Sequence, residues 1–167
     1  MLSLGNYEYG GDVKADVFDS SQQLIGSSTI YLDGVKVGDA AQTTSRLNLE
    51  VKPTDLFKFN ISMFSASNLF ANFNPEDFDT AGDQAMMLPA YELFDFGASY
   101  NLSIAGEMVY VRLNVNNLFD NAYISESATN IMVDPSDPSS TFLGVNTDNR
   151  AFPGWGRSWN LGFTYRF

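Results

Sequence analysis

The sequence predicts an all-β protein whose strands form an antiparallel meander. Apolar side chains recur at every second residue in six stretches, and no stretch shows the three-and-four spacing of an α-helix. Pro and Gly fall mostly between these stretches, as turn residues do. The expected strands are residues 7–19, 43–52, 55–69, 92–102, 107–118 and 158–167.

Each expected strand has one apolar face and one polar face. The polar positions include Lys58, Arg112 and Arg166 in the middle of strands. In chain order, the apolar faces are Val13, Ala15 and Val17; Leu47, Leu49 and Val51; Phe57, Phe59, Ile61 and Met63; Phe94, Phe96, Ala98 and Tyr100; Val109, Val111, Leu113 and Val115; and Trp159, Leu161, Phe163, Tyr165 and Phe167. A strand that crosses a membrane alternates in this way, so a mean hydropathy of −0.13 is compatible with a membrane barrel.

The connections alternate in length along the chain. Short turns are expected at Pro53–Thr54 and Ser103–Gly106, and long ones at residues 20–42, 70–91 and 119–157. Outer-membrane barrels have long loops on the outer side and short turns on the periplasmic side, with tilted strands of about 9–11 residues. The rhythm therefore favours membrane-spanning strands over a soluble β-sandwich, which has no reason to keep it.

Composition excludes several classes of function. The net charge is −11 with only 9 Lys and Arg, so no basic stripe for nucleic acid is available. The chain has no Cys and no His, which removes disulfides, thiol nucleophiles, Ser–His hydrolysis and the usual zinc ligands. No carboxylate pair has a spacing that sets up acid and base roles. We therefore expect neither an enzyme nor a cofactor.

Six strands are too few to close a membrane barrel, because the smallest have about 8. An open sheet in lipid would leave unpaired backbone groups along its edges. Residues 1–8 also lack the basic and apolar regions of a signal peptide. We therefore expect residues 1–167 to be the C-terminal barrel segment of a longer protein or, alternatively, a truncated gene product.

The last eight residues, 160–167, resemble the C-terminal assembly signal of outer-membrane barrels. The matching positions are Asn160, Gly162, Tyr165 and the terminal Phe167. The resemblance implies recognition by the barrel-assembly machinery.

Residues 112–123 resemble the segment near the end of TonB-dependent transporters that reads Asn-Leu-Phe-Asp followed by Tyr. The matching residues are Asn114, Asn116, Asn117, Leu118, Phe119, Asp120 and Tyr123. Asn116, Asn117 and Asp120 can bond nearby backbone where a strand leaves the membrane. Aromatic side chains at 119 and 123 suit an interfacial girdle. Residues 31–43, 88–91 and 154–160 are similar to the same family.

This resemblance implies a barrel of about 22 strands in the outer membrane of a Gram-negative bacterium. It implies an N-terminal plug, absent from this segment, that couples to the TonB complex, and import of a nutrient such as a glycan, a siderophore or a cofactor. The implied partners are outer-membrane lipid, the remaining strands and a surface lipoprotein. The alternatives are a non-transport barrel (adhesin or porin-like), a soluble carbohydrate-binding sandwich and, with least support, a barrel enzyme.

Two groups of loop residues are candidate sites. Glu76, Asp77, Asp79 and Asp83 place four carboxylates at a spacing that could hold Ca²⁺, although a solvated outer loop explains them better. The aromatic residues Tyr123, Phe142 and Trp155 could stack on a ligand, although a membrane-interface girdle is the favoured interpretation. Residues 134–140 are polar and turn-rich, which is typical of a loop tip.

Overall fold

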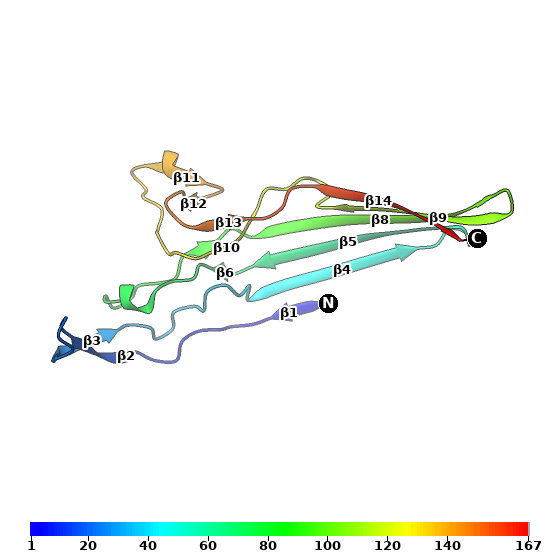
Figure 1. Ribbon diagram of the computed structural model, residues 1–167. Coiled ribbons are helices and arrows are strands. Elements are labelled where there is room, and N and C mark those ends of the chain that lie inside the picture. Colours follow the sequence, from blue (N-terminus) through cyan, green and yellow to red (C-terminus); the bar gives the residue numbers. More distant parts are fainter. Residues whose placement is uncertain (167) are drawn as a thin grey trace.

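The computed structural model describes residues 1–166, with only the backbone of Arg166, and its main element is one antiparallel sheet (Figure 1). The strand order is β1-β4-β5-β8-β9-β14. These strands are β1 (Leu2–Leu4), β4 (Thr43–Val51), β5 (Phe57–Ser67), β8 (Tyr91–Ile104), β9 (Glu107–Asn116) and β14 (Ser158–Arg166). From β4 onward each strand pairs with the next long strand of the chain, which confirms the predicted antiparallel meander. The sheet does not close on itself within residues 1–166.

Five of the six expected strands lie in this sheet, within two residues of their expected bounds. The expected strand at residues 7–19 is confirmed only in part, and it does not belong to the main sheet. Only Val13–Phe18 forms a strand, β2, and it pairs with β3 (Leu24–Ile30) in a separate hairpin. The sheet position beside β4 is occupied by β1.

The sequence explains this difference. Gly10 and Gly11 interrupt the alternation, and Gly11 has a φ of +145°, which a strand residue does not adopt. β3 had been expected as part of the loop 20–42, because Gly26, Ser27 and Ser28 replace its apolar positions and weaken the period-two signal. The hairpin turn is held by Asp19, whose Oδ1 accepts hydrogen bonds from the backbone of Ser21 and Gln23 at 2.8 and 2.9 Å.

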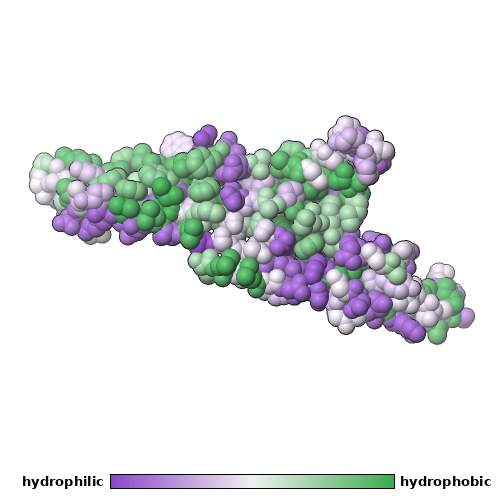
Figure 2. All heavy atoms as spheres, turned by 180° about the vertical axis from the view of Figure 1, so that it is seen from behind, coloured by the Kyte–Doolittle hydropathy of each residue, from purple (hydrophilic) through white to green (hydrophobic). Residues whose placement is uncertain are grey.

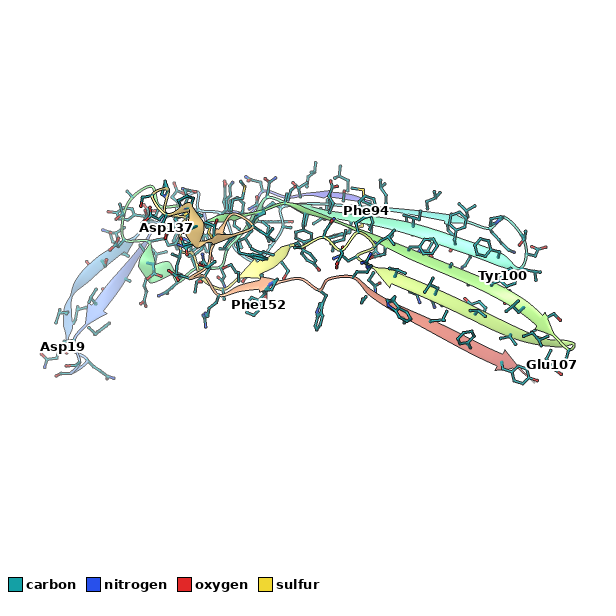
Figure 3. All side chains as sticks on the ribbon, turned by 90° about the horizontal axis from the view of Figure 1, so that it is seen from above. Asp19, Phe94, Tyr100, Glu107, Asp137 and Phe152 are labelled. Atoms are coloured by element: carbon teal, nitrogen blue, oxygen red, sulfur yellow. The ribbon has the colours of Figure 1, made fainter. Side chains whose placement is uncertain are left out.

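The long connections gather at one end of the sheet and the short turns at the other (Figure 1). Figure 3 shows Asp19 and Asp137 at the loop end and Glu107 at the turn end. The β8–β9 turn is Ala105–Gly106, with φ values of +54° and +90°. Two positive φ angles define a type I′ turn, whose twist suits a tight hairpin. The β4–β5 connection covers residues 52–56, which is longer than the expected Pro53–Thr54, and a Lys52–Asp55 ion pair of 3.0 Å crosses it.

The long connections contain short elements of their own. Three small antiparallel pairs lie in them: β6 (Leu69–Phe70) with β7 (Met87–Leu88), β10 (Ile124–Ser127) with β13 (Ala151–Pro153), and β11 (Thr141–Phe142) with β12 (Val145–Asn146). Two 3₁₀ turns, η1 (Pro75–Asp77) and η2 (Pro138–Ser140), complete them. In residues 1–166 no helix is long and apolar enough to span a membrane.

Nearly all of the buried core lies under the long connections, and Ala66 of β5 is the one buried apolar side chain on the five long strands in the described residues. One cluster of buried side chains consists of Leu69, Ala71, Met86, Leu88, Ile124 and Val145. A second consists of Leu32, Val35, Phe78 and Ala85. Neither cluster includes a residue of β4, β5, β8, β9 or β14. The sheet is therefore a single layer, and the loops pack on each other at its end.

Candidate functional site

The sheet has one continuous apolar face, because the strand register aligns the apolar residues of neighbouring strands. One row across the five long strands consists of Leu49, Ile61, Phe96, Val115 and Trp159. The next row consists of Val51, Phe59, Ala98, Leu113 and Leu161. In both rows every position is apolar. The predicted apolar faces of these strands therefore join into one surface.

This surface is uncovered. Leu47, Trp159 and Phe163 expose 64%, 70% and 68% of their area, and in residues 1–166 no second layer packs on them. Figure 2, seen from behind, shows apolar residues spread along the sheet end of the molecule. A contiguous apolar patch of this extent marks a surface that contacts lipid or another protein.

The opposite face of the sheet is polar and internally bonded. Lys58 Nζ lies 3.2 Å from Glu50 Oε2, Arg112 Nε donates to Asn114 Oδ1 at 3.2 Å, and Asn114 Nδ2 donates to Asn160 Oδ1 at 2.8 Å. Glu50, Lys58, Arg112 and Asn114 line a shallow hollow of about 280 Å³. Lys58, Arg112 and Asn114 thus share one polar face, as the alternation predicts. The side chain of Arg166 lies outside the described residues.

Asn117 is the hub of the family-like segment. It is 4% exposed and has a φ of +49°, a conformation that Asn tolerates better than most residues. Its Nδ2 donates to the backbone oxygens of Asn121 at 2.9 Å and Trp155 at 3.1 Å, and its Oδ1 accepts from Asn121 N at 2.9 Å. Its own N–H donates to Asp95 Oδ1 at 3.0 Å. The side chain of Asn117 therefore joins residues 121 and 155, and its N–H adds a bond to β8.

The neighbouring residues tie β9 to the start of β14. Arg157 N donates to Asp120 Oδ1 at 2.6 Å, and Asn116 Nδ2 donates to Ser158 Oγ at 3.2 Å. Leu118 N donates to the backbone oxygen of Phe94 at 2.6 Å. Of the three residues expected to bond nearby backbone, Asn117 does so at Asn121, whereas Asn116 bonds the Ser158 hydroxyl and Asp120 bonds the distant N–H of Arg157.

The loop aromatics do not form one cluster. The Tyr123 ring stacks on Tyr91 with centroids 4.5 Å apart, and Phe119 meets Phe94 edge-on at 5.3 Å. A Cβ at Gly154 would collide with the Tyr123 ring, so a larger residue there would displace the ring. Trp155 is 89% exposed and Phe142 is 52% exposed. No ring contact joins Tyr123, Phe142 and Trp155 in the described part of the chain.

The acidic loop does not assemble a metal site. Glu76 and Asp77 lie in η1, which Asn74 caps, and Asp79 accepts a hydrogen bond from Thr80. Across residues 1–166, no three acidic side chains converge to hold a metal ion. The loop tip at residues 134–140 is built on Asp134, whose Oδ1 accepts from Ser136 N and Oγ at 2.8 and 2.7 Å. These two hydrogen bonds lower the pKa of Asp134.

Three residues of the segment that resembles an assembly signal lie on β14. Asn160, Gly162 and Tyr165 pair with Asn114, Arg112 and Val109 of β9. Phe167 lies outside the described residues. The sequence assigned no separate role to Asn121, Gly154 and Arg157, which bond Asn117, Tyr123 and Asp120. Their partners are distant in sequence, except that the Asn117–Asn121 spacing hinted at a closed turn.

Neither the models of known protein families nor the curated proteins contain a match to this chain.

Proposed function

We propose that the chain is part of the barrel of a TonB-dependent outer-membrane transporter, which binds and imports a nutrient such as a glycan, a siderophore or a cofactor. The observation that carries the proposal is the uncovered apolar face of a single-layer sheet whose other face is polar. Lipid on one side and an aqueous lumen on the other would satisfy both faces. No catalytic step is assigned to the chain.

The strand lengths support a membrane span. β4, β5, β8, β9 and β14 have 9, 11, 14, 10 and 9 residues. A tilted strand needs about 9–11 residues to cross the hydrocarbon layer. Long connections at one end and short turns at the other match an outer and a periplasmic side.

The open edges of the sheet support a larger barrel. In residues 1–166 no strand pairs with the outer edge of β14, and β1 covers only Thr43–Ser45 of β4. Unpaired backbone groups in lipid cost several kcal/mol each. The proposal therefore includes further strands of the same protein, placed by the barrel-assembly machinery, together with a plug that couples to the TonB complex. A surface lipoprotein over the loops belongs to the same proposal.

The experiment that tests the proposal is fractionation of native membranes, with an antibody against residues 136–147. We expect a band far above 18.5 kDa that stays with the outer membrane after alkaline extraction. A soluble band at 18.5 kDa would overturn the proposal in favour of a sandwich. Co-purification of the intact protein with the periplasmic domain of TonB would separate a transporter from a non-transport barrel, which should not retain that domain.

A further inference from the structure

Two of the long connections line an open hollow of about 580 Å³ at the loop end. One wall comes from residues 74–84 and the other from residues 128–150. This volume lies within the range of about 300–1,000 Å³ that is typical of small-ligand sites. It is also separate from the shallow hollow on the polar face of the sheet.

The walls of the hollow are held together by hydrogen bonds between the two connections. Asn130 Oδ1 accepts from Met86 N at 2.5 Å, and Asn130 Nδ2 donates to Gln84 O at 3.4 Å. On the second wall, Asn149 Oδ1 accepts from Thr129 Oγ1 at 3.0 Å and from Ile131 N at 2.8 Å. The hollow is therefore built by specific contacts and is not a gap between loose loops.

Three charged side chains on its walls have no partner. Asp77, Asp83 and Arg150 form no side-chain hydrogen bond or ion pair with any of residues 1–166. Ile131 and Met132 also line the hollow and expose 42% and 49% of their area. The hollow thus offers two carboxylates, one guanidinium group and an apolar wall to a ligand.

The net charge of the loop end favours a ligand with positive charge. The five long strands and the two short turns carry five acidic and five basic residues, so they are electrically balanced. The remaining residues, nearly all in the long connections, carry fifteen acidic and four basic residues, so the net charge of −11 resides at the loop end. Such a field attracts cations and repels anions.

We propose that this hollow binds a short basic peptide, an inference that deepens the proposed function by naming the class of ligand. Ammonium or guanidinium groups of the peptide lie against Asp77 and Asp83, and an apolar side chain lies against Ile131 and Met132. Arg150 receives the terminal carboxylate. Charge-assisted contacts of this kind are stronger than neutral hydrogen bonds, so the peptide is recognised by its two kinds of charge together.

The experiment is calorimetry on the intact protein in detergent, with a tetrapeptide of alternating lysine and leucine as the probe. We expect Asp77→Asn with Asp83→Asn to raise Kd about tenfold or more, because both carboxylate contacts are lost. The matched control is Asp33→Asn with Asp39→Asn, which removes the same charge from exposed positions that do not line the hollow. The control should raise Kd less than about threefold, through the general field alone.

Arg150 is tested with the same peptide in its C-terminally amidated form. Amidation should raise the Kd of the peptide for the wild type, because the contact between the peptide carboxylate and Arg150 is lost. In Arg150→Gln this contact is already absent, so amidation should raise the Kd no further. Equal losses in the two Asp double variants, or amidation effects that ignore Arg150, would overturn the proposal. So would tighter binding of a neutral oligosaccharide or an anionic chelate that depends on Asp77 and Asp83.

Different results would overturn the peptide site and the transporter function. Peptide binding by a protein that fractionates as soluble would overturn the transporter and leave the peptide site standing. A protein confined to the outer membrane that retains the TonB domain but ignores the peptide would do the reverse.

Discussion

Leu113 of β9 lies directly opposite Leu161 of β14, in an apolar row that nothing in residues 1–166 covers. If this row meets lipid, Leu113→Arg places a charge in hydrocarbon. We expect the free energy of unfolding from liposomes to fall by about 2–4 kcal/mol. Urea titration of the intact protein, refolded in liposomes, measures the change.

The matched control is Arg112→Leu, one residue away on the opposite face. Arg112 donates one exposed hydrogen bond to Asn114 at 3.2 Å, so its loss should change the free energy of unfolding by less than about 1 kcal/mol. If Leu113→Arg assembles as well as the wild type while Arg112→Leu does not, the faces have been assigned the wrong way round.

Asn117 should be the most sensitive polar residue at the loop base. Asn117→Ala removes three side-chain hydrogen bonds from a buried position and leaves backbone groups of Asn121 and Trp155 without partners. We expect a loss of about 1–3 kcal/mol in the free energy of unfolding. Limited proteolysis should also cut residues 119–157 sooner, because the base of that connection is no longer fixed.

Asn116→Ala is the comparison for this variant. Asn116 is exposed and makes one side-chain bond, to Ser158 at 3.2 Å. Its loss should cost about 0.5–1 kcal/mol and leave the proteolysis pattern unchanged. Similar proteolysis of both variants would show that Asn117 is not the hub of the loop base.

The sequence predicted strands well where apolar residues alternate without interruption, as in residues 92–102 and 107–118. It was right only in part at residues 7–19, because Gly10 and Gly11 break the strand and its partner β3 has Gly26, Ser27 and Ser28 in place of an apolar face. Pairing of β3 with β2 is a contact between segments, and local periodicity carries little information about it.

Site residues could be predicted from the sequence only where they lie together in one short segment. Asn117 and Asp120 were found from their segment, but Arg157 N bonds Asp120 from 37 residues away. The hollow at the loop end was not predictable, because Asp77 was noticed only within its own loop and Arg150 lies in another loop that has no periodicity. Loop packing decides which polar residues meet, and the spacing of one loop does not encode its contacts with another.

The β8–β9 turn contains a residue poorly suited to its backbone. Ala105 has a φ of +54°, a left-handed conformation that disfavours residues with a Cβ by roughly 1–2 kcal/mol. Asn is preferred at this position of a type I′ turn, so Ala105→Asn should raise the free energy of unfolding by about 0.5–1 kcal/mol. Ala105→Val should lower it, because a β-branched side chain fits this conformation worse. Urea midpoints in liposomes give the order, and a midpoint for Val above that for Asn would rule out the turn type.

Glu8 and Lys36 should make one loop contact sensitive to acid. Their side chains lie 2.6 Å apart, and the hydrogen bond and charge of Lys36 lower the pKa of Glu8 below its ordinary 4.5. A lowered pKa stabilises the folded state above the unfolded value, and this contribution is lost as the pH falls through the folded pKa. Below pH 4.5 we therefore expect faster hydrogen exchange at Tyr9 and Val37, whose amides bond Val35 and Tyr7 across the same contact.

Two variants serve as controls. The protection factors of these amides should not change with pH in Glu8→Gln, and in Glu76→Gln they should follow the wild type. If Glu8→Gln keeps the acid-induced loss, the ion pair does not control this part of the loop.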